Sequence, residues 1–281
     1  MGASLLQQWA ALAATLPQRV LGLVGWLAAM ALLFGALERL RPARSQRFLR
    51  RDLGADLGYY FLSGIVPAFA VAAATVAVSW VLSGWVPPRF MAAVAALPLG
   101  LRVALLIVVG DAAYYAAHRA SHAVPWLWRF HRIHHSPTEL DWLVNTRAHP
   151  VDLMVARVVP LVPLLAFGLR QPGLRDMEAV AALYLTLTTV WAFFVHANVR
   201  VRLGPLEHVV TSPAFHHWHH HHEPGAPQHC NFASLLPVLD RLFGTWHLPP
   251  DRLPSTYGAA DALPPTLGAQ LLSPFRPEPR R

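Results

Sequence analysis

Histidine is the residue type in this chain best suited to chemistry, and it occurs 16 times in 281 residues. Three short boxes, HRASH, HRIHH and HHWHH, carry the most regular spacing, and the last lies between Pro213 and Glu223. Their candidate ligands are His118, His122, His131, His134, His135, His216, His219 and His220. Residues three or four apart share one helix face, so each box presents its imidazoles together. Imidazole is the commonest side-chain metal ligand. Eight imidazoles are too many for one ion, so the boxes predict a two-metal site.

The third box continues into a longer run of histidines that has a simpler explanation. His217, His221 and His222 lie on other helix faces than the rest, so we expect them to be bystanders. A loose metal-buffering tract is the alternative reading of the whole run. Trp218 interrupts the run, however, and the spacing repeats that of the second box, which favours a defined site.

Composition places the chain in a membrane. It is 54% hydrophobic and only 14% charged, with a mean hydropathy of +0.36, whereas soluble domains carry about 25% charged residues. The formal net charge of +8 comes from arginine without lysine. These arginines cluster beside apolar segments, which favours contacts with lipid headgroups over nucleic-acid binding. The single Cys230 excludes an internal disulfide framework, a cysteine zinc finger and a cysteine-ligated iron–sulfur cluster.

The elements that must position the boxes are apolar helices. We expect four to five spans or half-spans, the last two forming a partly re-entrant hairpin with a turn at Arg170–Arg175. The expected segments are Val20–Leu37, Tyr59–Val86, Ala92–Ala117, Leu153–Leu169 and Met177–Ala197. For the first segment a buried helix of a soluble protein is the alternative. The predicted fold is an all-α integral membrane protein with a helical cytoplasmic cap that holds the histidine site.

Charge predicts which way the helices run. A basic loop from Arg39 to Arg51 follows the first span, and the positive-inside rule places it in the cytoplasm. Two further crossings return the chain to that side at His118. We therefore divide the chain into N-terminal transmembrane helices (1–110), a catalytic region (111–247, including the membrane hairpin 153–197) and a proline-rich, extended C-terminal tail (248–281).

The three boxes resemble the HxxxH, HxxHH and HxxHH boxes of the fatty acid hydroxylase/sterol desaturase superfamily, the membrane-bound, histidine-rich di-iron oxygenases. The similarity runs from Asp111 to Trp246 and includes three further segments. These are NTRAHP (145–150), HAN (196–198) and the pair NF (231–232) and DRLFGT (240–245). Leu239, Ala233 and Asp152 depart from the usual Trp, Gly and Glu of the superfamily. None of these departures removes a ligand, so they bear on subgroup and substrate.

The resemblance adds further residues to the candidate site. It implies that His196 is a ninth metal ligand. Asn198 belongs to the same segment and is a candidate partner of the ligands. Asp111 lies seven residues before His118, almost on the same helix face, so we expect its carboxylate to hydrogen-bond to a ligand or to a neighbouring span. His149 is a candidate ligand, a partner of a ligand or a helix-cap residue before Pro150.

The chemistry that the resemblance implies is O2-dependent oxidation of a C–H bond in a lipid by two iron ions, with hydroxylation favoured over desaturation. Zinc can take the place of iron in purified protein. Electrons would come from a small acidic redox protein docked on the basic face, because the chain has no haem, flavin or nicotinamide motif. The lysine-free composition favours a bacterial inner membrane, with the active site facing the cytoplasm. A histidine-lined metal transporter and a structural zinc protein are the competing hypotheses. Histidine ligands must be unprotonated, so we expect metal loss below about pH 6.5.

Overall fold

The structure is a computed structural model, and it describes residues 14–47, 49–167, 177–250, 252–260 and 262–276. Within these ranges the chain forms helices, turns and two isolated β-bridges. It contains no β-strand there. The predicted all-α fold is therefore confirmed. The long helices are α2 (Leu16–Leu40), α3 (Leu53–Ser83), α5 (Leu99–Ala123), α7 (Pro150–Ala166) and α8 (Met177–His196). The short ones are α4 (Pro88–Ala95), α6 (Pro125–His131), α9 (Pro213–His219), α10 (Val238–Leu242), α11 (Leu267–Leu272) and the 3-10 helices η1 (Trp142–Thr146), η2 (Gly204–His208) and η3 (Ser273–Phe275).

Four of the long helices, α2, α3, α5 and α8, are long and apolar enough to cross a membrane. In the most apolar stretch of each, only 11% to 28% of the residues are buried inside the protein. Large apolar side chains such as Leu32 and Trp80 are therefore exposed, at 76% and 79%. A soluble protein would cover such a surface, whereas lipid is the natural neighbour for it. The chain is an integral membrane protein.

The helix boundaries differ from the expected spans in two places. The expected third span is split into α4 and α5, because Pro98 lies between them and α5 starts directly after it. Proline is compatible with the entry to a helix but interrupts the middle of one. By contrast, α7 continues through Pro160 and Pro163 as one helix. The expected turn at Arg170–Arg175 lies outside the described residues.

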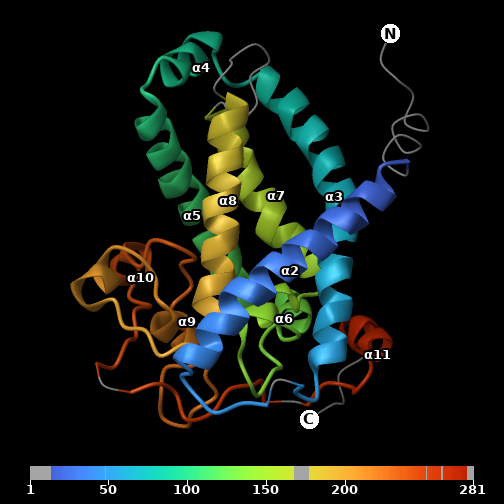
Figure 1. The fold of residues 1–281 in the computed structure, drawn as a ribbon. Helices are drawn as coiled ribbons and strands as arrows, with labels where there is room; N and C mark the ends of the chain where they lie inside the picture. Colours follow the sequence, from blue (N-terminus) through green and yellow to red (C-terminus); the bar gives the residue numbers. More distant parts are fainter. Residues whose placement is uncertain (1–13, 48, 168–176, 251, 261, 277–281) are drawn as a thin grey trace.

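The helices converge on a cap at one end of the molecule, where α6, α9, α10 and α11 lie (Figure 1). Two apolar clusters hold the long helices in place. Leu106, Leu164 and Tyr184 join α5, α7 and α8, whereas Phe34, Trp142 and neighbouring side chains join α2, η1 and α8. The first cluster lies toward the end of the helices opposite to the cap, whereas the second fixes the C-terminal part of α8 against α2 and η1 near the cap.

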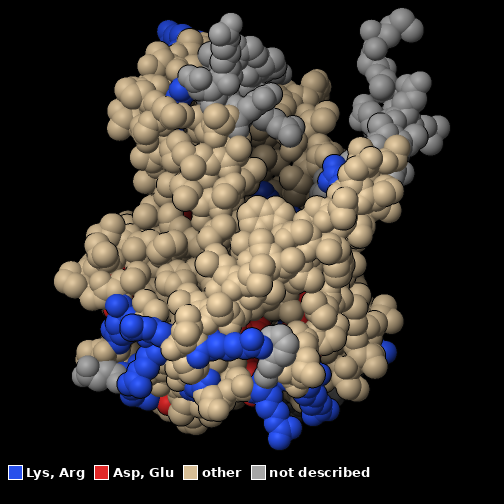
Figure 2. All heavy atoms as spheres, viewed as in Figure 1, with Lys and Arg blue, Asp and Glu red and all other residues tan. Residues whose placement is uncertain are grey.

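Basic side chains gather at the cap end of the molecule, as Figure 2 shows. The loop that joins α2 to α3 lies at this end (Figure 1) and carries Arg41, Arg44 and Arg47. The chain beyond residue 247 also lies there. It is not fully extended as expected, because it contains α11 and η3, and its Tyr257 hydroxyl hydrogen-bonds to His217 at 2.8 Å.

Candidate metal centre

Four elements deliver histidines to one place in the cap. The last two turns of α5 carry His118 and His122, four residues apart, and α6 ends at His131. His134 and His135 follow in the turn after α6. The other four histidines come from the C-terminal residue of α8, His196, and from α9 with its C-cap. The residues of α9 and its cap are His216, His219 and His220.

The structure brings nine histidines into two groups, in each of which the potential ligand atoms lie within 4.8 Å of one another. The first group is His118, His122, His131, His135 and His219. The second group is His134, His196, His216 and His220. All eight box residues and His196 are included, so each box contributes to at least one group and the second and third boxes contribute to both.

The hydrogen bonds of the Nδ1 atoms determine which ring nitrogen carries the proton. His118, His134, His196 and His219 each have Nδ1 next to a backbone carbonyl oxygen, at 2.7–3.2 Å. A carbonyl oxygen can only accept, so each Nδ1 must be the protonated nitrogen. In a neutral imidazole the other nitrogen, Nε2, then carries a bare lone pair. Nε2 of these four rings is therefore available as a metal ligand.

The bare lone pairs point at one another. Nε2 of His134 lies 3.2 Å from Nε2 of His196, and both nitrogens lack a proton. Nε2 of His118 faces Nε2 of His131 at 3.2 Å in the other group. Two facing lone pairs repel, and neither nitrogen can donate to the other. A cation bound by both removes the repulsion, so the donor set fits metal ions. Further buried ring nitrogens, including both of His122 and Nε2 of His219, have no hydrogen-bond partner among the described residues.

His131 is oriented by a carboxylate instead of a carbonyl. Its Nδ1 donates to Asp152 in the first turn of α7, at 3.0 and 3.1 Å to the two oxygens. Such a carboxylate fixes the ring orientation and increases the basicity of the ligating nitrogen. In the sequence, Asp152 stands out only as a departure from the usual Glu. Its position directly after the His149–Pro150 helix start is the signal that could have pointed to it.

Burial keeps the histidines of the cap uncharged. The pKa values of His134, His135, His216, His219 and His220 are lowered well below 6.5, first because the rings are desolvated and then because neighbouring imidazoles repel a second positive charge. Neutral rings are the form that binds metal. These five rings are therefore ready to bind cations without first losing protons at neutral pH.

The three further candidates contact other parts of the protein. The Asp111 carboxylate accepts from the backbone N–H groups of Ser234, Leu235 and Leu236, at 2.6–3.1 Å, so it holds the loop after the third box. His149 caps the N-terminus of α7 by accepting from the Val151 N–H, and its Nε2 donates to the carbonyl of Leu271. The side chain of Asn198 pairs with the backbone of Arg44. We find no hydrogen bond between these three side chains and the nine histidines in the described residues.

The three expected bystanders lie outside both groups. His217 donates from Nε2 to the Ala197 carbonyl and accepts from the Tyr257 hydroxyl, so it ties α9 to the end of α8 and to the C-terminal tail. His221 donates to the Pro227 carbonyl, and His222 is exposed.

The loop after α9 is locked by Asn231 and Asp240. Asn231 adopts a left-handed backbone with φ of 60°, and its side-chain amide bonds to the backbone of Phe215 and His247. Asp240 accepts from the backbone N–H groups of Phe232 and Ala233. The Phe232 carbonyl in turn accepts from His118. These residues therefore hold the carbonyl that sets the tautomer of a box histidine.

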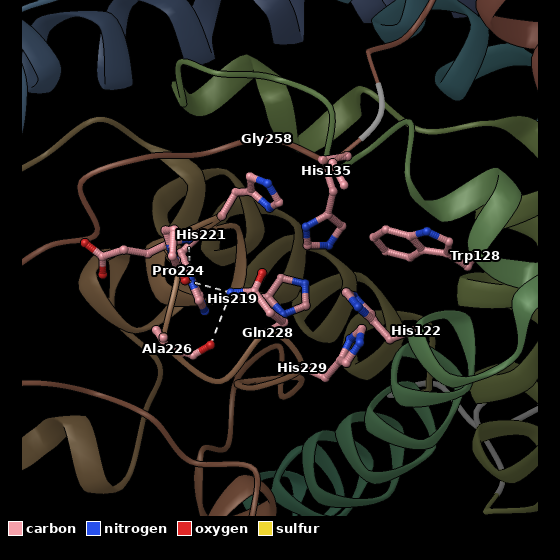
Figure 3. Close-up of a pocket in the computed structure, with 15 residues that line it drawn as sticks. His122, Trp128, His135, His219, His221, Pro224, Ala226, Gln228, His229 and Gly258 are labelled. Atoms are coloured by element: carbon pink, nitrogen blue, oxygen red, sulfur yellow. Dashed lines mark hydrogen bonds between the residues drawn. The ribbon is translucent and has the colours of Figure 1, made fainter. Parts of the chain in front are cut away.

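One side of the centre opens to the exterior through a cavity of about 490 Å³ (Figure 3). His122, His135 and His219 line its inner end, together with Trp128. His229 is exposed and its ring lies 5.7 Å from that of His122, between centroids. The remaining lining residues come from the segments 221–228 and 258–260 of the cap. The five-histidine group is thus reachable from the cap side.

Comparison with known proteins places this centre in a family. The family model named Fatty acid hydroxylase matches residues 103–245, which is just over half of the chain and includes all nine histidines. The chain belongs to the fatty acid hydroxylase family. The resemblance seen in the sequence is therefore confirmed. No solved structure matches the chain.

Curated relatives of this fatty acid hydroxylase family member include lipid-modifying enzymes. An ornithine lipid hydroxylase of Rhizobium tropici is 34% identical over 185 residues, which cover 66% of this chain and 53% of the relative. The human alkylglycerol monooxygenase is 29% identical over 139 residues, covering 48% of this chain and 28% of the relative. A fatty acid hydroxylase of a Lecanicillium species is 28% identical over 158 residues, covering 52% and 42%. The matches thus span about half or less of each relative.

Proposed function

We propose that this chain is a membrane-bound, O2-dependent di-iron enzyme that hydroxylates a C–H bond of a lipid. The observation that carries the proposal is the pair of histidine groups, in which unprotonated Nε2 atoms face one another. No donor arrangement among neutral imidazoles satisfies these contacts, whereas two cations would. The family membership and the lipid-hydroxylating relatives support the reaction.

Iron is the proposed metal. Imidazole suits iron, zinc and copper alike, so the donor atoms alone do not select one. The relatives are named hydroxylases and monooxygenases, and both names require redox chemistry that zinc does not provide. The nine histidines would hold two ions, and iron bound there would supply the activation of dioxygen. Zinc can occupy the same donors in protein that is purified without added iron.

The overall reaction consumes one dioxygen, two electrons and two protons, and it gives an alcohol and one water. The electrons must come from another protein or a soluble donor, since the sequence contains no motif for a redox cofactor. The basic cap end of the molecule would attract an acidic redox protein (Figure 2). The cavity beside Trp128 and His229 gives such a donor its approach to the five-histidine group.

The residues of this chain keep the reacting region dry and rigid. Phe215, Trp218 and Phe232 are fully or almost fully buried around the third box. Asp152 holds the ring of His131, and backbone carbonyls hold the rings of four further histidines, His118, His134, His196 and His219. Exclusion of water protects reactive species from side reactions. The apolar helices α5 and α8 end at the centre, so an acyl chain in the membrane can approach it from that side.

The orientation in the membrane is also proposed. The arginine-rich loop between α2 and α3 lies at the cap end, and the positive-inside rule places that end in the cytoplasm. The Rhizobium relative supports a bacterial inner membrane as the location. A transport pathway would place ligands along the spanning helices, but the two groups lie together at one end of them, which favours an enzyme over a transporter.

The direct test is incorporation of labelled oxygen. Iron-supplied protein in nanodiscs is given a bacterial lipid extract, a chemical reductant with a small ferredoxin, and isotopically labelled dioxygen. We expect a lipid that has gained one labelled oxygen atom, and no such product from His219→Ala. Products that carry no dioxygen-derived atom in any lipid fraction, with iron bound, would contradict the proposed reaction.

A further inference from the structure

Arg157 is a charged residue in an otherwise apolar helix. It lies in the sequence VDLMVARVVPLV of α7, which runs from the cap into the membrane part of the molecule (Figure 1). Asp152, the partner of His131, is five residues earlier in the same helix. At 1.5 Å per residue, Arg157 is about 7.5 Å further along the helix axis. The residue thus lies close to the metal centre on the membrane side.

The face of α7 that carries Arg157 points into the protein. Pro160 and Leu164 follow it by three and seven residues, share its face, and are buried. Leu164 packs against Leu106 and Tyr184 of α5 and α8. The exposed Val159 and Val162 lie on the other side of the helix. Arg157 is nevertheless exposed.

An exposed side chain on an inward face lies at an opening between helices. Figure 2 shows a hollow among the membrane helices, between the part of the surface that α8 covers and the part that α3 covers, with basic atoms inside it. Figure 1 draws α7 between these two helices. Because Arg157 is exposed and shares the inward face of α7, its side chain opens to a space between α7 and the helices α5 and α8.

No counter-ion accompanies this arginine in the described part of the chain. Its side chain forms no hydrogen bond or ion pair with a described residue. Arg50 and Arg147, which are buried near the cap, are both paired with the carboxylate of Asp56. A charge at membrane depth is costly and marks a functional position by default. The missing partner points to an anion from outside the chain.

A second polar group lies beside the metal centre. Tyr114 lies one turn before His118 in α5, and its ring is 5.3 Å from that of His118, between centroids. Asp152 is close enough to act on its hydroxyl electrostatically. In the described residues that hydroxyl makes no hydrogen bond. A polar ligand that extends from Arg157 toward the centre would therefore find a second hydrogen-bonding group there.

We propose that Arg157 binds the anionic headgroup of the substrate, a carboxylate or a phosphate, and so makes this chain select anionic amphiphiles over neutral lipids of the same chain length. The guanidinium offers a planar fork of donors that matches both kinds of anion. The role as a substrate residue rests on the proposed function, but the binding preference itself does not need the reaction.

Calorimetric titration of the full chain in a neutral detergent tests the preference without turnover. The probes are hexadecanoate, hexadecyl phosphate and hexadecanol, which share one chain and differ in headgroup. We expect at least one anionic probe to bind about tenfold or more tighter than the alcohol, as for a hydrogen bond to a charged group. The better of the two anions identifies the headgroup chemistry.

Three variants show where the preference arises. Arg157→Gln should lose most of it, whereas Arg157→Lys should keep part of it. Arg41→Gln/Arg47→Gln removes two exposed charges of the basic loop and should leave the preference unchanged. Equal binding of all three probes by the wild type, or a preference that survives Arg157→Gln, would overturn the proposal. Loss of the preference in Arg41→Gln/Arg47→Gln would also overturn the proposal.

The test of headgroup binding is designed to be independent of the proposed di-iron function. Titrations are run on metal-free protein, and iron binding is measured in parallel on each variant. Arg157→Gln should bind as much iron as the wild type, which also shows that it folds. A chain that binds anionic amphiphiles through Arg157 but holds no iron would refute the proposed function alone. A chain that binds iron without the headgroup preference would refute only the role of Arg157.

Discussion

The residue-level feature that most distinguishes the centre is the shared orientation of five of its nine histidine rings. Four rings donate from Nδ1 to backbone carbonyls and one donates to Asp152, so Nε2 of each is left as a lone pair. The tautomers are thus set by the fold before any metal binds. Backbone carbonyls, which cannot titrate, accept from Nδ1 in four of these rings, and the Asp152 carboxylate accepts from the fifth.

That carboxylate should have a measurable effect on metal affinity. In Asp152→Asn, His131 loses an anionic acceptor and its ligating nitrogen becomes less basic. We expect metal affinity to fall about 10- to 100-fold, as for other carboxylate partners of ligating histidines. Competition with a chromophoric chelator measures the affinity, and Glu139→Gln in the loop after the second box serves as the matched control. Unchanged affinity in Asp152→Asn would show that the carboxylate does not act on the metal.

Two histidines beside the boxes should behave differently from each other. His196 joins the four-histidine group, whereas both ring nitrogens of His149 are engaged in capping α7 and in bonding to Leu271. His196→Ala should therefore lower the bound metal per chain. His149→Ala should keep the metal and lose only stability, about 1 kcal/mol for a cap. Elemental analysis and thermal unfolding separate the two effects, and metal loss in His149→Ala alone would reverse the assignment.

At the scale of elements, a buried ion network joins the start of α3 to the segment before α7. Asp56 is fully buried and pairs with Arg50 and Arg147, and Arg50 also pairs with Asp141 at the N-cap of η1. The backbone carbonyl of Arg147 accepts from His134. The network thus positions an acceptor of the second histidine group.

Breaking this network should cost far more than breaking a surface ion pair. Arg147→Gln leaves the Asp56 carboxylate buried with one partner fewer, and removal of one member of a buried pair costs about 3–5 kcal/mol. Arg252→Gln breaks the pair with Glu223, in which the arginine side chain is 57% exposed, and should cost much less, because water screens an exposed pair. Thermal unfolding in one detergent compares them. Equal losses would show that the network is not a main support of the cap.

The sequence predicted the helices and the ligand-bearing boxes because both follow from local spacing. Apolar runs reveal α2, α3, α5 and α8, and HxxHH spacing places imidazoles on one face. The partners of the ligands are different. Asp111 was expected near His118 by helix periodicity, yet it holds residues 234–236, and the carboxylate at His131 is Asp152. These hydrogen bonds depend on how α5, α6 and α7 pack against one another. The spacing of residues within one helix does not predict that packing.

At the scale of the whole molecule, the buried histidines should make the fold sensitive to acid. Burial lowers the pKa of His217 from 6.5 to about 4 and those of five cap histidines well below 6.5. The unfolded chain therefore binds more protons than the folded one as pH falls below about 6.5, and stability falls with it. Burial raises the pKa of Asp240, which acts in the opposite direction, but histidines with a lowered pKa outnumber the carboxyls with a raised one.

The melting temperature of metal-free protein should thus be nearly constant above about pH 7.5 and fall steadily from about pH 6.5 toward pH 4. Bound metal should be released over the same range, since protons compete for the same nitrogens. A pH series of thermal unfolding with parallel metal analysis measures both. A melting temperature that rises on acidification would contradict the neutral state of the buried rings.

The central claim is that the boxes form one di-iron centre, and the metal content and Mössbauer spectrum of anaerobically purified, iron-supplied protein test it most directly. Wild-type protein is compared with His131→Ala/His219→Ala, in which two members of the five-histidine group are removed. We predict about two irons per chain, from the two groups that imidazole can fill, exchange-coupled after oxidation and lost or uncoupled in the variant. Iron near zero in the wild type, or a spectrum that the variant leaves unchanged, would contradict the account.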